Sequence, residues 1–143
     1  MLSVRQINKM LRRQNDFISL TGLVCCEADC GRCIMEAEVG SNMLNTNGMA
    51  HGGFLFTLAD TACGLAGGLT EKGWRRLVTQ SAAVYYIRAC EPGTHIRAVA
   101  ERVHGGRSTG VVSCGIFDGQ DRLLLRGEFS VFYLGGYVET EAE

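Results

Sequence analysis

The stretch of about residues 50–65 constrains the fold more than any other, because it is apolar on nearly every side of a helix. Its apolar residues recur at the spacing of an α-helix, and Gly67 and Gly68 predict the C-terminal end of that helix. A surface helix would show a clear polar face. The chain must therefore supply other structure that wraps this helix on most sides. The apolar positions are 54, 55, 58, 59, 62, 65 and 66.

One carboxylate, Asp60, interrupts this apolar segment, which begins with His51-Gly52-Gly53. An unpaired buried carboxylate costs several kcal/mol or escapes ionisation through a shifted pKa. A lone Asp among Phe, Leu and Ala is therefore usually kept for chemistry or for a specific partner. An ion pair with an arginine across an interface is the alternative interpretation.

Segments with the pattern of β-strands, before and after this helix, supply the structure that covers it. Turn sequences around Gly93, Gly105 and Gly119 separate four runs after the helix, and they predict antiparallel neighbours in a meander. Before the helix, residues 17–39 predict a hairpin of two strands. The result is an α+β architecture in which a curved antiparallel sheet wraps one long central helix. The four later runs cover roughly 77–89, 94–104, 107–117 and 122–134.

The two ends of the chain carry different patterns. Near-helical spacing of Leu2, Ile7, Met10 and Leu11 predicts a short amphipathic helix within residues 1–14, placed as a lid over one sheet edge. Residues 1–13 lack the apolar core of a signal peptide, and residues 137–143 predict a flexible acidic tail. A length of 143 residues with 46% apolar composition predicts one domain, residues 1–143.

The charge of the chain and its one long apolar stretch limit the kinds of partner that it can bind. A net charge of −1 with scattered basic residues disfavours nucleic acid and anionic membranes, and predicts a small or neutral partner. The apolar stretch 48–69 contains His51, Asp60 and six glycines, which disfavours a membrane span.

Seven cysteines, an odd number, suit reduced, buried thiols in a cytoplasmic protein better than a disulfide framework. Cys30 and Cys33 have the spacing of a redox or zinc pair, but no second pair follows, so no metal is expected. The role of Cys25, Cys26, Cys30 and Cys33 beyond packing stays open.

The motif Asn45-Thr-Asn-Gly-Met-Ala-His51-Gly52-Gly53, followed by Leu58-Ala59-Asp60-Thr61-Ala62, resembles the signature of PaaI-like hotdog-fold acyl-CoA thioesterases. The later segment Val103-His-Gly-Gly-Arg107-Ser108-Thr109 and the turn Asp118-Gly119 resemble the hairpin turns of that family. The order of elements matches from about residue 15 to residue 135. The run 84–90 departs from the Asn-x-x-Phe-Leu-Arg-Pro type of many relatives, which bears on the acyl pocket more than on the chemistry.

The resemblance implies a role for several residues. Asp60 would be the catalytic carboxylate, the Gly52 backbone N–H the oxyanion donor, and Asn45 would position water or the thioester. Thr79 falls where family members often keep Ser or Thr near the water. His51 either braces the loop by hydrogen bonds or acts as a base, and bracing is favoured.

Coenzyme A enters as part of the substrate, and no separate cofactor is expected. The phosphates of CoA need hydrogen-bond donors. Such donors are present after a Gly-Gly turn at Arg107, Ser108 and Thr109, and Arg88 is a further candidate. An acyl slot would draw on Phe54, Phe56 and Leu58, with Tyr85, Tyr86 and Trp74 as contributors for an aromatic substrate. Core packing is favoured over this role for most of them.

The positions of Gly52 and Asp60 predict a shared active site. Eight residues separate them, which is roughly 12 Å along a helix, so one thioester carbon cannot touch both within one chain. If both act on one bond, Gly52 of one chain meets Asp60 of another across a two-fold dimer interface. The resemblance implies the same, since hotdog proteins act as dimers or as tetramers built from dimers.

The sequence thus predicts a homo-oligomeric acyl-CoA thioesterase in which Asp60 is a general base or a nucleophile. A non-catalytic acyl-CoA or fatty-acyl binding protein is one alternative, and Asp60 argues against it. A hydratase or dehydratase of the same fold is another. That chemistry uses a catalytic His in a different motif, whereas Asp60 lies nine positions after the only nearby His, His51.

Overall fold

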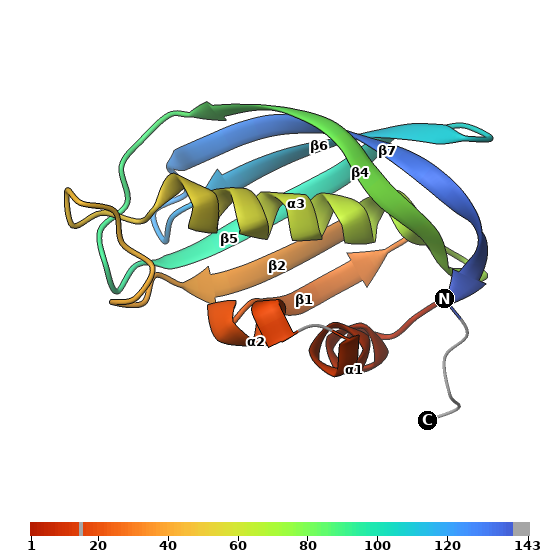
Figure 1. Ribbon diagram of the computed structural model, residues 1–143, viewed down its shortest axis with the longest axis horizontal. Helices are drawn as coiled ribbons and strands as arrows, with labels where there is room; N and C mark the ends of the chain where they lie inside the picture. Colours follow the sequence, from red (N-terminus) through yellow and green to blue (C-terminus); the bar gives the residue numbers. More distant parts are fainter. Residues whose placement is uncertain (15, 139–143) are drawn as a thin grey trace.

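A seven-stranded antiparallel sheet curves around helix α3 in the computed structural model, which describes residues 1–14 and 16–138 (Figure 1). The predicted α+β architecture, a curved antiparallel sheet around one long helix, is confirmed. The helices are α1 (Val4–Gln14), α2 (Asp16–Thr21) and α3 (Gly52–Gly68). The strands are β1 (Val24–Asp29), β2 (Arg32–Glu38), β3 (Leu69–Thr70), β4 (Gly73–Tyr86), β5 (His95–Gly105), β6 (Thr109–Phe117) and β7 (Leu123–Val138).

The strand order is β1-β2-β5-β6-β7-β4-β3, and it corrects the predicted meander. The order β5-β6-β7 follows the prediction, but β4 pairs with β7 rather than with β5. The segment around Pro92 and Gly93 is therefore a crossover and not a hairpin turn. Turn chemistry is local, whereas the partner of a strand is decided by the whole sheet.

Helix α3 packs its apolar surface against five strands of the sheet, which explains its composition. Leu58, Ala59 and Ala62 are fully buried, as are Met35, Ile96, Val112, Ile116 and Phe129 on the facing strands. Phe54 and Leu58 belong to this core rather than to a cavity wall, so core packing is the correct role for them. Phe56 packs its ring against Phe129, with ring centroids 5.5 Å apart.

Gly67 and Gly68 lie inside the last turn of α3. The helix ends at Gly68, close to the predicted stop, but neither glycine has the positive φ of a helix-ending glycine, and the C-cap residue Leu69 is in extended conformation. A Cβ on Gly68 would lie 2.6 Å from the carbonyl oxygen of Arg75, and one on Gly67 would lie 3.2 Å from side-chain carbons of Leu77 and Val112. These glycines allow a close approach between α3 and the sheet, a requirement that the sequence alone does not reveal.

Helix α1 begins with a capping box and covers one edge of the sheet, as predicted for the N-terminal helix. The Gln6 backbone N–H donates to Ser3 Oγ, and the Ser3 N–H donates to Gln6 Oε1. The Asn8 side chain pairs with both backbone polar groups of Cys25 on the edge strand β1, at 2.8 Å each. The predicted two-strand hairpin begins only at β1, because residues 16–21 form α2.

At the other end, β7 includes Tyr137 and Val138, so the predicted tail from residue 137 is wrong for these two positions. The remainder of that tail, residues 139–143, lies outside the described residues. No helix in the described part of the chain has the length and apolar character needed to cross a membrane.

Candidate active site

The start of α3 is organised by His51, whose side chain caps the helix. His51 Nδ1 accepts a hydrogen bond from the Gly53 N–H at 2.8 Å, and its carbonyl accepts from Phe54 and Leu55. The bracing role predicted for His51 thus agrees with its contacts. The Gly52 N–H donates to no acceptor among the described residues and stands at the positive end of the helix dipole. It is available to an oxygen that gains negative charge.

Asn45 shapes the loop that approaches this N–H. Its Oδ1 accepts from the backbone N–H groups of Asn47 and Met49, at 2.9 and 3.2 Å. The acceptor oxygen is therefore used by the loop, and the side-chain NH₂ is the group left for a ligand. Asn45 and Gly52 line a cavity of about 320 Å³ together with Tyr86, whose hydroxyl donates to the Gly52 carbonyl at 3.2 Å.

Asp60 lies two turns further along α3 and is half-buried. Thr79 on β4 donates its hydroxyl proton to Asp60 Oδ1 at 2.7 Å, which places these two candidates in direct contact. Asp60 Oδ2 has no hydrogen-bond or ionic partner among residues 1–14 and 16–138. One carboxylate oxygen is thus fixed by Thr79, and the other can accept a proton.

A cavity of about 310 Å³, lined by apolar side chains together with Asp60, Thr61 and Thr79, opens beside the Asp60 carboxylate. Trp74 forms part of its wall and donates its indole N–H to the Gly64 carbonyl at 3.0 Å, which ties β4 to α3. Met10 and Leu11 of α1 form another part of the wall. The N-terminal helix therefore contributes to the candidate site as well as covering a sheet edge, and no local signal in the sequence indicates this contribution.

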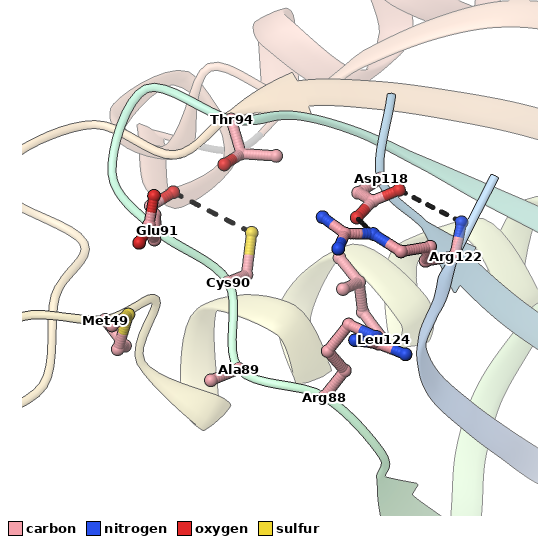
Figure 2. A pocket seen from close by; sticks show the side chains of 9 residues that line it. All are labelled: Met49, Arg88, Ala89, Cys90, Glu91, Thr94, Asp118, Arg122 and Leu124. Carbon is pink, nitrogen blue, oxygen red and sulfur yellow. Dashed lines mark hydrogen bonds and ion pairs between the residues drawn. The ribbon is translucent and has the colours of Figure 1, made fainter. Parts of the chain in front are cut away.

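Arg88 lies in the crossover after β4 and lines two adjoining cavities. One is the Gly52 cavity, and the other, of about 330 Å³, also contains Cys90, Asp118 and Arg122 (Figure 2). The Arg122 N–H donates to Asp118, as do the Gln120 N–H and the Arg122 guanidinium, and these bonds hold the pKa of Asp118 below its ordinary value although burial opposes them.

The β5–β6 turn carries Arg107 and Ser108, Thr109 begins β6, and this turn lies near the other end of α3. Tyr133 links the two, because its N–H donates to the Ser108 carbonyl and its hydroxyl donates to the Gly67 carbonyl at 2.9 Å. Arg107 and Ser108 are exposed. Within one chain, α3 therefore separates the predicted residues into three groups: Asn45, Gly52 and Arg88 at its start, Asp60 and Thr79 at its middle, and Arg107 to Thr109 near its end.

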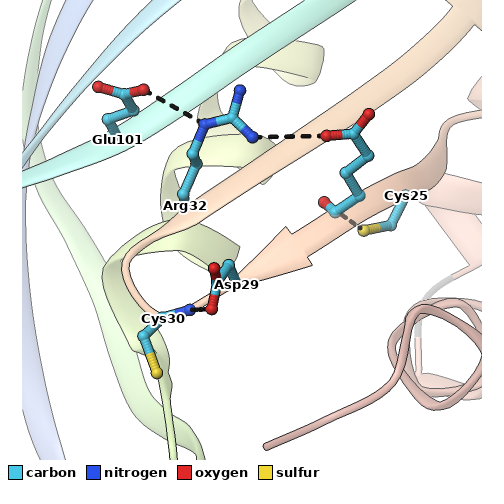
Figure 3. Close-up of polar contacts among 6 residues, drawn as sticks. Cys25, Asp29, Cys30, Arg32 and Glu101 are labelled. Carbon is cyan, nitrogen blue, oxygen red and sulfur yellow. Dashed lines mark hydrogen bonds and ion pairs between the residues drawn. The ribbon is translucent and has the colours of Figure 1, made fainter.

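The cysteines do not form a reactive pair. Cys30 is exposed in the β1–β2 turn, where its N–H is held by the Asp29 carboxylate (Figure 3). Cys33 is buried, its thiol donates to the Ala62 carbonyl at 3.1 Å, and burial raises its pKa. Burial also raises the pKa of Cys25 to about 11, which disfavours a thiolate. In the described residues, no three or more His, Cys, Asp or Glu side chains group as metal ligands.

The fold and the arrangement around α3 define a hotdog-fold protein with a carboxylate in an apolar cleft. A family model described as Thioesterase superfamily matches residues 47–125, more than half of the chain. The chain belongs to the thioesterase superfamily, and the prediction of a thioester hydrolase is confirmed at that level. The match begins just before the His51 cap and includes both Asp60 and Arg107.

Individual relatives agree with this family. The chain is 29% identical to the acyl-coenzyme A thioesterase PaaI of Escherichia coli strain K12 over 121 residues, which cover 85% of this chain and 84% of the relative. The solved structure of the E. coli PaaI protein from the phenylacetic acid degradation operon matches with a TM-score of 0.85 at 24% identity, covers 95% of this chain and 99% of its own, and shows the shared fold.

A Streptococcus mutans protein solved with bound acetyl CoA is also similar to this chain. It matches with a TM-score of 0.76 at 28% identity, and the match covers 81% of this chain and 91% of that protein.

Proposed function

We propose that this protein hydrolyses an acyl-CoA thioester to the free acid and CoA as a homodimer, with Asp60 as base or nucleophile and the partner subunit's Gly52 N–H as oxyanion donor. The observation that carries the proposal is the Asp60 carboxylate, bonded by Thr79 on one oxygen and open on the other, beside an apolar cavity. The relatives named for acyl-CoA hydrolysis and solved with acetyl CoA support this choice of substrate.

Two routes use the Asp60 carboxylate. In the first, Asp60 takes a proton from water while the water oxygen bonds to the thioester carbon. In the second, Asp60 itself bonds to that carbon, and water later cleaves the anhydride. Both routes break the carbon–sulfur bond and end with one proton on the CoA sulfur. ¹⁸O found in the Asp60 side chain by mass spectrometry after turnover in ¹⁸O water would establish the anhydride route, because the general-base route exchanges no oxygen of Asp60.

The need for a second subunit rests on distance and on uncovered surface. Gly52 and Asp60 are about 12 Å apart along α3, too far to hold one reacting carbon. Strand β4 pairs with β7 along one edge, but among the described residues only the two-residue strand β3 pairs with its other edge. An open edge of this length is a template for pairing with another chain. The half-exposed Thr57, Asp60 and Thr61 of α3 supply a matching uncovered face.

The same pairing would bring the separated CoA-binding candidates together. In a two-fold pair that sets Gly52 of one chain against Asp60 of the other, the end of α3 near Arg107 extends past the start of the partner's helix. Arg88 lies beside that start. We assign the CoA phosphates to Arg107, Ser108 and Thr109 of one subunit, with Arg88 supplied by its partner.

We assign the acyl group to the cavity beside Asp60, because most of its lining side chains are apolar and Asp60 itself lines it. Trp74 is part of this wall, as the sequence suggested. Tyr86 instead lines the Gly52 cavity, and Tyr85 is exposed.

Thiol release from a panel of short, long and aromatic acyl-CoAs tests the proposal. Asp60→Asn should lower kcat by about 10²–10⁴-fold because it removes the base or nucleophile, and it should leave acyl-CoA binding nearly unchanged. Asp121→Asn makes the same change at an exposed turn position and should keep wild-type activity. Equal activity of wild type and Asp60→Asn would contradict the proposed role of Asp60. Tight retention of intact acyl-CoA by wild type, with no thiol released, would favour the non-catalytic binding protein.

A further inference from the structure

Arg75, in the first half of β4, reaches across to the β5–β6 turn. Its guanidinium donates to the carbonyl oxygen of Gly106 at 3.0 Å and to that of Arg107. It also lies over the ring of Tyr133, with Cζ 3.6 Å from the ring centroid. One side chain thus holds two successive carbonyls of a turn that is more than 30 residues away in the sequence.

Tyr133 provides a fixed base for this contact. It is 6% exposed, its hydroxyl is bonded to the last turn of α3 at Gly67, and its N–H holds the Ser108 carbonyl at 2.8 Å. A guanidinium over an aromatic ring gains about 0.5–2 kcal/mol, depending on its exposure. Three successive turn carbonyls are therefore drawn toward Arg75 and Tyr133.

The direction of these carbonyls decides the direction of the N–H groups. In a planar trans peptide the carbonyl of one residue and the N–H of the next point to opposite sides. Because the Gly106 and Arg107 carbonyls face Arg75, the N–H groups of Arg107 and Ser108 face away from it. Neither N–H has a hydrogen-bond acceptor within the described part of the chain.

We propose that Arg75 is a positioning residue that shapes the β5–β6 turn into a cradle for one phosphate group of the CoA substrate. Two successive N–H groups that face outward from a turn offer an anion two neighbouring backbone donors. The exposed guanidinium of Arg107 and hydroxyl of Ser108 add side-chain donors on the same two residues. The inference rests on the proposed function and adds a residue that touches no substrate.

Arg75→Lys and Arg75→Ala test this role with two substrates that share an acyl group, acyl-CoA and acyl-pantetheine, of which only the first has phosphates. Lysine cannot hold two carbonyls with one planar fork, so both variants should raise KM for acyl-CoA roughly tenfold at unchanged kcat. Values of kcat/KM for acyl-pantetheine should match wild type. Arg126→Ala removes an exposed arginine on β7 and should change neither substrate.

Binding of adenosine 3′,5′-bisphosphate, measured by calorimetry, gives a readout that does not depend on hydrolysis. Arg75→Lys should weaken this binding roughly tenfold if one charge-assisted contact is lost. Equal binding by Arg75→Lys and wild type, or an equal loss of activity on both substrates, would overturn the inference. Arg75-dependent bisphosphate binding by a wild type that hydrolyses no acyl-CoA would uphold the cradle and refute the proposed function.

Discussion

Single polar side chains fix the loops that carry the candidate site. His51 uses one ring nitrogen to hold the first turn of α3, and Asn45 uses its amide oxygen to hold the loop before it. Asp118 does the same in the β6–β7 turn, where its two oxygens accept three donors. Each bond spans only two to four residues, so these roles follow from short sequence patterns.

The depressed pKa of Asp118 predicts an acid-dependent loss of stability. Since its folded-state pKa lies below the ordinary value of 3.8, the ionised form stabilises the fold above that pH, and the contribution disappears as pH falls through the folded-state pKa. Asp118→Asn should therefore lower the free energy of unfolding at pH 7 and flatten its dependence on pH below 4, in urea titrations. Asp121→Asn, at an exposed carboxylate in the same turn, serves as control. An acid limb parallel to that of wild type would contradict this prediction.

At the scale of elements, the contact between the last turn of α3 and the start of β4 positions Asp60. Trp74 and Arg75 lie against Gly68, and the Trp74 indole is bonded to Gly64. This contact sets the distance between α3 and the sheet, and that distance allows the Thr79 hydroxyl to donate to the Asp60 carboxylate. Glycine spacing alone does not distinguish such a contact from a helix stop.

Gly68→Ala should destabilise the protein by about 1–3 kcal/mol, because the new Cβ meets the Arg75 backbone and the Trp74 ring. Gly64→Ala is the matched control. Its Cβ would meet only a Leu77 methyl at 3.9 Å, so it should gain about 0.5–1 kcal/mol from helix propensity. Thermal and chemical unfolding measure both changes. Equal stability of the two variants would show that the close approach at Gly68 does not constrain the helix.

At the scale of the whole molecule, the described residues of one chain leave two features uncovered: the open edge of β4, with exposed apolar side chains, and the polar face of α3 that carries Thr57, Asp60 and Thr61. Val78 and Tyr85 on β4 are 47% and 67% exposed. Both features adjoin Asp60 or Gly52, so a second copy of the chain that covers them would also complete the proposed site.

Mixing two inactive variants tests whether the site is shared. Gly52→Pro removes the N–H at the first helical position, where the fixed φ of proline suits the helix and the new Cβ would lie 3.2 Å from the exposed Tyr86 ring. Asp60→Asn removes the carboxylate. Each variant alone should be inactive. After unfolding and refolding together, half of the dimers should be mixed and each should hold one intact site, which gives about a quarter of wild-type activity.

Each variant refolded alone is the control for that mixing experiment. No recovery of activity in the mixture, although native mass spectrometry shows mixed dimers, would place Asp60 and Gly52 in separate sites and contradict the shared one.

The sequence by itself determined the periodicity of α3, the antiparallel β-rich architecture and the Asp60 candidate, because these depend on local spacing and on the cost of a charge among apolar residues. The motif from Asn45 to Ala62 further indicated the family. Only the tertiary structure decided that β4 pairs with β7, that Gly67 and Gly68 allow close packing, that Met10 and Leu11 line the cavity beside Asp60, and that Arg75 holds the β5–β6 turn. These contacts join residues far apart in the chain, and their energies depend on packing and strand partnership, which no local pattern encodes.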